Sequence, residues 1–108
     1  MVYSVKQIAD IVRPIAEQHH LKAVYLFGSY ARGTATEQSD IDLLIDTTGT
    51  SIKSLLGLAA VYCDLEAALK KQVDLITISS LEQSSSMVSQ EHFRANVMAE
   101  RVNLYAVA

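Results

Sequence analysis

The spacing of apolar residues predicts helices alternating with short strands along the chain. Residues 4–19 repeat apolar side chains at helical spacing, and Ser4 stands where an N-cap residue is preferred. Pro14 should kink or split this helix, because proline lacks the backbone N–H that continues the hydrogen-bond ladder. His19 and His20 are expected to end the helix with their side chains in solvent, since sequence neighbours on a helix point in different directions.

Three short apolar runs predict buried strands, at Ala23–Phe27, 41–45 and 73–78. Between the last two runs, residues 52–71 predict a long helix. Its apolar stripe is expected to consist of Ile52, Leu55, Leu56, Ala59, Ala60, Cys63 and Ala67. Residues 87–100 predict a further helix, and 102–105 a last short strand. This order predicts an α/β (α+β) fold in which helices flank a small mixed β-sheet.

Length and composition add limits to this picture. The chain has 108 residues, so we expect a single domain over residues 1–108. Hydrophobic residues make up 50% of the chain, which fits either a buried sheet or an apolar face for a partner, and composition alone does not decide between them. The lone Cys63 is expected to be a small buried hydrophobe rather than a reactive thiol.

Charge and hydropathy exclude two function classes. The net charge of −3, from nine Lys and Arg against twelve Asp and Glu, argues against a general nucleic-acid binder, which usually carries a basic patch. No segment resembles a secretory leader, and no apolar run approaches the roughly 20 residues that span a membrane. The sequence therefore predicts a soluble cytoplasmic protein that does not enter a membrane.

The turn after the first predicted strand has features suited to binding a phosphate. Gly28 lets a phosphate approach the backbone closely, Ser29 adds a hydroxyl donor, and Arg32 adds a fixed positive charge. A Gly–Ser pair alone is usually an ordinary turn. Tyr30 could stack on a nucleotide base or pack beside the turn, and the sequence leaves both alternatives open.

Two aspartates at the start of the second predicted strand favour a metal site. Residues two apart in a strand point to the same face, about 6.6 Å apart along the chain. Asp40 and Asp42 have this spacing, and their charges repel unless a cation lies between them. Magnesium prefers oxygen ligands and keeps positions open for substrate phosphates. An isolated Asp-x-Asp is more often a solvated strand end.

Asp74 lies within the otherwise apolar third strand. An ionised carboxylate in such a strand costs several kcal/mol unless it is paired or bound to a metal. If this strand lies beside the strand that carries Asp42, all three carboxylates can share one face of the sheet. Asp74 would then be placed to bind the catalytic metal and to accept a proton from an attacking hydroxyl. The alternative is an ordinary acidic residue at a strand start.

The run Gly28-Ser29, ten residues, then Asp40-x-Asp42 resembles the signature of the minimal nucleotidyltransferases of the DNA polymerase β-like superfamily. The neighbouring residues are also similar to that family, and Asp74 falls where the family places its third carboxylate. The resemblance covers nearly the whole chain and implies the polymerase β-like nucleotidyltransferase fold. It implies that Gly28 and Ser29 contact the nucleoside triphosphate. It further implies that Arg32 supports either the phosphates or the helix of the motif.

The same resemblance implies a magnesium-dependent enzyme with ATP as nucleotide donor. Asp40 and Asp42 would bind two Mg²⁺ ions, and Asp74 would complete the catalytic metal site and act as, or assist, the general base. Chains of this size resemble the MntA-type antitoxins of HEPN–MNT toxin–antitoxin pairs, which adenylylate a tyrosine of an all-helical HEPN ribonuclease. Two alternatives stay open: transfer to a small hydroxylated molecule such as an aminoglycoside, and a binding-only antitoxin without turnover.

Overall fold

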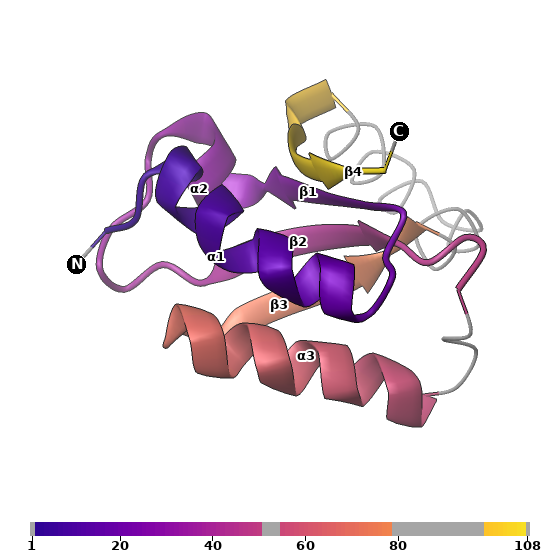
Figure 1. The fold of residues 1–108 in the computed structure, drawn as a ribbon. Helices are drawn as coiled ribbons and strands as arrows, with labels where there is room; N and C mark the ends of the chain where they lie inside the picture. Colours follow the sequence, from indigo (N-terminus) through magenta and orange to yellow (C-terminus); the bar gives the residue numbers. More distant parts are fainter. Residues whose placement is uncertain (1, 51–54, 79–98, 108) are drawn as a thin grey trace, which may run out of the picture.

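The computed structural model describes residues 2–50, 55–78 and 99–107, and its centre is a four-stranded mixed sheet. The strands lie in the order β3-β2-β1-β4 (Figure 1). Along the chain the elements are α1 (Val5–Gln18), β1 (Ala23–Phe27), α2 (Gly28–Arg32), β2 (Ile41–Asp46), α3 (Leu55–Leu69), β3 (Val73–Thr77) and β4 (Val102–Ala106). The predicted α/β class with a small mixed sheet is confirmed.

The sheet is mixed because β1 runs antiparallel to both β2 and β4, whereas β2 runs parallel to β3. A parallel pair needs a crossover connection, and α3 lies between β2 and β3 in sequence and provides it. α1 and α3 lie on the same face of the sheet and contact each other (Figure 1). The main core lies between these helices and the sheet, and its strand residues include Leu26, Leu43 and Val73.

α1 begins where the sequence predicts and runs through its proline. The Ser4 side chain accepts a hydrogen bond from the Gln7 N–H, and the Gln7 side chain accepts one from the Ser4 N–H, which forms a capping box. Of the expected kink or split at Pro14, the split is wrong, since Val5–Gln18 is one helix. Pro14 is solvent-exposed, so water can bind the carbonyl group that its missing N–H leaves free.

The end of α1 is less solvated than the sequence suggests. His19 is the C-cap residue, as predicted, but its side chain is only 17% exposed. Its Nε2 lies 2.8 Å from Oδ2 of Asp64 on α3. The expectation of a free histidine in solvent is therefore wrong for His19, because tertiary packing places a carboxylate beside it. The two helices are joined at this point as well as through the core.

The predicted apolar stripe of α3 does not face the core. Val61, Leu65 and Leu69 are fully buried against the sheet and α1. Ile52, the first residue of the expected stripe, lies outside the described residues. Five later members of the stripe lie on the outer surface: Leu56 is 82% exposed, and Ala59, Ala60, Cys63 and Ala67 are exposed as well. The helix is apolar on both faces, so periodicity could not tell which face the sheet would cover. Cys63 is therefore not the buried hydrophobe that we expected.

The remaining sequence expectations concern the C-terminal part and the membrane. β4 confirms the last predicted strand, and Glu100 ends a helical stretch just before it. The rest of the helix expected at 87–100 lies outside the described residues. Within the ranges that the structure describes, no helix is long and apolar enough to cross a membrane.

Candidate functional site

The candidate site lies on the face of the sheet opposite α1 and α3, where β2 and β3 run side by side. Within β2, Ile41, Leu43 and Ile45 belong to the main core. Asp42 and Leu44 alternate with them and point to the other face. The parallel register pairs Asp42 directly with Asp74 of β3. The condition that the sequence left open, that the two strands are neighbours, is met.

Asp42 and Asp74 interact strongly in this arrangement. Their carboxyl groups lie within hydrogen-bonding distance of each other. Partial burial raises the pKa of Asp42 from 3.8 to about 6, and the hydrogen bond and charge of Asp74 and the charge of Asp40 act in the same direction. The positive charge of Arg32 lowers the pKa but does not outweigh them. The pair therefore concentrates negative charge at one point on the sheet.

Asp40 lies close to this pair without joining it. The i, i+2 spacing implied that Asp40 and Asp42 point to the same face of one strand. Asp40 precedes the first residue of β2, so strand geometry does not fix the direction of its side chain. No three His, Cys, Asp or Glu side chains in the described ranges are arranged so as to hold a metal ion. The contribution of Asp40 to the pKa of Asp42 nevertheless shows that its charge acts on the same site. The structure thus brings two of the predicted carboxylates into contact and the third into their neighbourhood.

Gly28 borders the carboxylate pair and requires its lack of a side chain. Its φ is +74°, a conformation that residues with a Cβ rarely adopt. A Cβ atom here would overlap Oδ2 of Asp42 and lie 2.9 Å from its Cγ. β1 pairs Phe27 with Asp42, which brings the end of β1 alongside the carboxylate. The Gly28 backbone therefore lies directly against the Asp42 carboxylate.

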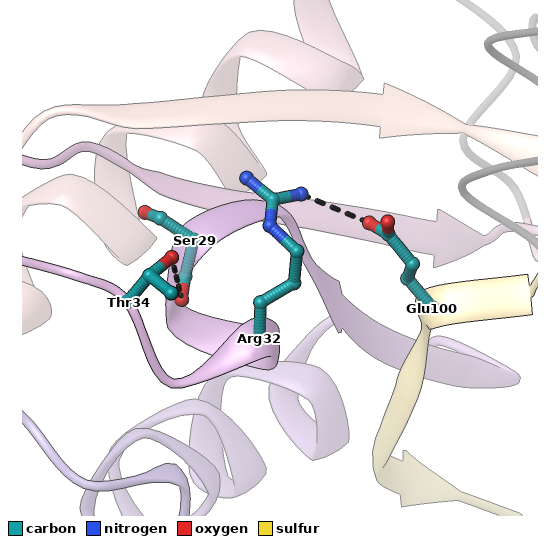
Figure 2. Close-up of polar contacts among 4 residues, drawn as sticks. All are labelled: Ser29, Arg32, Thr34 and Glu100. Atoms are coloured by element: carbon teal, nitrogen blue, oxygen red, sulfur yellow. Dashed lines mark hydrogen bonds and ion pairs between the residues drawn. The ribbon is translucent and has the colours of Figure 1, made fainter.

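α2 is a short helix that carries the other predicted binding residues. It ends at Gly33 in the left-handed conformation, and the Thr34 N–H then donates to the Ser29 carbonyl at 3.0 Å. Figure 2 shows the Ser29 hydroxyl and the Arg32 guanidinium on the same side of this helix. Tyr30 is only 4% exposed and packs in the main core, which excludes its stacking on a nucleotide base in this structure.

The loop before β2 is held by its own hydrogen bonds. The Ser39 N–H donates to the Thr36 carbonyl at 3.0 Å, and the Ser39 hydroxyl accepts from the Thr36 N–H at 2.9 Å. The Ile41 N–H donates to the Gln72 carbonyl at 3.1 Å and so joins the loop end to the segment before β3. These contacts position Asp40, and the presence of hydroxyl residues in the loop was their only signal in the sequence.

One contact at the site comes from the far end of the chain. Nη1 of Arg32 donates to Oε2 of Glu100 at 2.9 Å (Figure 2). Sequence reasoning did not single out Glu100, because 68 positions separate it from Arg32 and no local pattern links them. Only the pairing of β4 with β1 brings the two residues together.

Two adjacent carboxylates beside a glycine turn are typical of enzymes that use divalent metal ions to transfer phosphorus-containing groups. The sequence comparison gives the same class, since residues 5–97 match the nucleotidyltransferase domain family. The chain belongs to this family and is a nucleotidyltransferase.

Known proteins similar to this chain include both relatives and solved structures. The protein adenylyltransferase MntA of Thermococcus cleftensis is 40% identical over 70 residues, which cover 65% of this chain and 69% of that protein. A chain in the crystal structure of a toxin–antitoxin with AMP-PNP has a TM-score of 0.68 and 24% identity, over 92% of this chain and 73% of that chain.

A second solved structure is the complex of a tri-AMPylated Shewanella oneidensis HEPN toxin with its MNT antitoxin. A chain of that complex has a TM-score of 0.63 and 19% identity, over 95% of this chain and 73% of that chain. At this level of identity the two structures support the shared fold. The resemblance to minimal nucleotidyltransferases that the sequence indicated is confirmed.

Proposed function

We propose that this nucleotidyltransferase transfers AMP from ATP to a tyrosine of a cognate HEPN toxin and thereby acts as its antitoxin. The similarity to the adenylyltransferase MntA supports a protein acceptor. The fold is also that of a chain found with an AMPylated HEPN toxin in Shewanella oneidensis.

The contact between Asp42 and Asp74 is the observation that carries this proposal. In the proposed reaction the tyrosine oxygen attacks the α-phosphorus of ATP, the bond between the α-phosphorus and the bridging oxygen breaks, and pyrophosphate leaves. The proton of the hydroxyl passes to a carboxylate. Asp74 suits this role because its side chain is solvent-exposed, where an acceptor can reach it.

The acidic pair also fits Mg²⁺, which oxygen ligands bind preferentially. Partial burial, together with the hydrogen bond and charge of Asp74 and the charge of Asp40, raises the pKa of Asp42 to about 6, and a divalent cation would remove the repulsion that contributes to this rise. Asp42 and Asp74 would hold the metal, and Asp40, whose charge already acts on Asp42, would complete the set. Bound Mg²⁺ would neutralise the carboxylates and polarise the phosphate oxygens of the nucleotide.

Residues of β1 and α2 would bind the nucleotide. Gly28 presents backbone without a side chain beside Asp42, so a phosphate could come close to the metal site. The Ser29 hydroxyl and the Arg32 guanidinium lie on one side of α2 and could both donate to phosphate oxygens (Figure 2). Together these residues would hold the triphosphate along the edge of the acidic pair.

The outer face of α3 has two features that fit the proposed function: one fits binding of a protein partner, and the other fits a reducing compartment. Leu56, Ala60, Cys63 and Ala67 form an exposed apolar stripe on this helix. Apolar stripes of this kind on monomers usually mark contact surfaces. An exposed free thiol fits the cytoplasm, where thiols stay reduced.

The test is intact mass spectrometry of the cognate HEPN protein after incubation with this chain, ATP and Mg²⁺. We expect one or more AMP masses on the HEPN protein, located on tyrosine by peptide mapping. Asp42→Asn should abolish the mass gain. Asp46→Asn is the matched control, because Asp46 belongs to the same strand but is not in contact with Asp74.

Two other outcomes would redirect the proposal. A stable complex without any mass gain would overturn AMP transfer and favour an antitoxin that acts by binding alone. Adenylylation of an aminoglycoside by the isolated chain, without modification of the HEPN protein, would favour a small-molecule acceptor.

A further inference from the structure

Glu100 is far from the candidate site in sequence and adjacent to it in space. β4 pairs antiparallel with β1, and Val102 lies opposite Leu26, two residues before the start of α2. This register carries the residues just before β4 toward α2. Oε2 of Glu100 consequently accepts a hydrogen bond from Nη1 of Arg32 at 2.9 Å (Figure 2).

The two residues that follow Glu100 both hold its segment against β1. The guanidinium of Arg101 lies 4.3 Å from the ring centroid of Tyr25 on β1, a cation–π contact. Val102 is the first residue of β4 and is paired with β1. Glu100 is therefore presented by an anchored strand end rather than by a free terminus.

The contact with Glu100 uses only one end of the Arg32 guanidinium. Figure 2 shows the second terminal nitrogen pointing away from Glu100, on the side of α2 where the Ser29 hydroxyl lies. The charge of Arg32 also acts on Asp42, whose pKa it lowers. One end of the guanidinium is thus bonded to Glu100, while its charge acts on Asp42 and its second terminal nitrogen stays available on the Ser29 side of α2.

We propose that Glu100 is a positioning residue, which holds the Arg32 side chain so that its free donors face the triphosphate of the bound nucleotide. This inference rests on the proposed nucleotide site. A free arginine side chain has many rotamers, and its planar donors bind phosphate well only in the correct orientation. The bond to Glu100 selects one orientation before the nucleotide arrives, and this reduces the entropic cost of binding.

A purely structural role is a poor explanation of the pair. The side chains of Arg32 and Glu100 are 49% and 36% exposed, and ion pairs with this exposure add little to stability. A second alternative is that the negative charge of Glu100 competes with the phosphates for Arg32. Positioning and competition predict opposite effects on nucleotide binding when Glu100 loses its charge.

The experiment compares Glu100→Gln, Arg32→Ala and the double variant of the full chain. The measured quantities are KM for ATP and kcat in AMP transfer to the HEPN protein, and the Kd of AMP-PNP with Mg²⁺. We expect Glu100→Gln to raise both KM and Kd about fivefold with kcat nearly unchanged, a size typical of coupling between contacting residues. In the Arg32→Ala background, Glu100→Gln should have no further effect. Arg32→Lys serves as a second background if Arg32→Ala does not fold.

Glu17→Gln is the control for the loss of one negative charge, since Glu17 is exposed on α1 and lies outside the candidate site. Its KM and Kd should equal those of the wild type. Equal or tighter AMP-PNP binding by Glu100→Gln would overturn the positioning role. A fivefold effect that persists without Arg32 would overturn it as well. A wild-type chain that binds AMP-PNP but transfers no AMP would contradict the proposed function, whereas the binding series would still test Glu100.

Discussion

Asp42→Asn should make the metal-free protein more stable at neutral pH. Partial burial and the proximity of Asp74 and Asp40 raise the pKa of Asp42 from 3.8 to about 6. Since the pKa is higher in the folded state than in the unfolded state, the stability linked to this group is fully present below about pH 4 and is lost as the pH rises through about 6. At neutral pH the ionised carboxylate therefore destabilises the fold, and a neutral amide of the same shape removes this cost.

The size of the effect follows from the same pKa. Each tenfold change in proton affinity corresponds to about 1.4 kcal/mol, so the rise from 3.8 to about 6 has an upper limit of about 3 kcal/mol. Asp42 is only partly buried, and water screens its interactions. We therefore expect a gain of about 1 kcal/mol for Asp42→Asn, or an increase in Tm of about 4–8 °C for a domain of this size.

The assay is thermal unfolding in EDTA at about pH 7.5 and about pH 4, followed by circular dichroism. The Tm of Asp42→Asn should be higher than that of the wild type at about pH 7.5, and the difference in Tm should become small at about pH 4. The control is Asp46→Asn. Although partial burial opposes it, hydrogen bonds from Thr48 lower the pKa of Asp46, so its ionised form stabilises the fold at neutral pH. This control should be less stable than the wild type at about pH 7.5.

A wild type as stable as Asp42→Asn, or more stable, at about pH 7.5 in EDTA would refute the reasoning. It would mean that groups at the site already compensate the carboxylate charge without a cation. Addition of Mg²⁺ and AMP-PNP should reverse the order, because ligands that bind only the folded state stabilise it.

Three further predictions concern other parts of the structure. Gly28→Ala should lower AMP transfer at least about 100-fold because its Cβ displaces the adjacent carboxylate, whereas Gly49→Ala, which also has a positive φ but nothing within 4 Å of its Cβ, should keep activity. Measured by urea unfolding, Leu65→Ala should lower the free energy of unfolding by about 2–5 kcal/mol, and Leu56→Ala should lower it by less than about 0.5 kcal/mol. Equal losses would contradict the orientation of α3. Maleimide should label Cys63 rapidly in the isolated native chain, and slow labelling there would contradict the exposure of the outer face.

The sequence by itself determined the strands and the chemistry of the motif. The apolar runs of β1, β2 and β3 are short and continuous, and they are bounded by residues that end strands, so local pattern was sufficient. The positions of Gly28, Asp42 and Asp74 at the ends of these runs also follow from local pattern. Their likeness to a known motif led to the correct family.

The local sequence pattern did not predict the structure correctly where two different packing arrangements fit the same pattern. α3 is apolar on both faces, and only the packing of Val61, Leu65 and Leu69 against the sheet shows which face is inside. Cys63 lies on the other face for the same reason. Pro14 did not end α1, because packing of the helix on the core outweighs one missing hydrogen bond.

Only the tertiary structure decided which residues of the site meet. The parallel register of β2 and β3 puts Asp42 beside Asp74, and the antiparallel register of β1 and β4 brings Glu100 to Arg32. Strand register depends on the packing of whole faces and on the connections between strands, not on the residues within one strand. The sequence therefore determined which groups are present for the proposed nucleotide transfer, and the pairing of the strands determined which of them lie together.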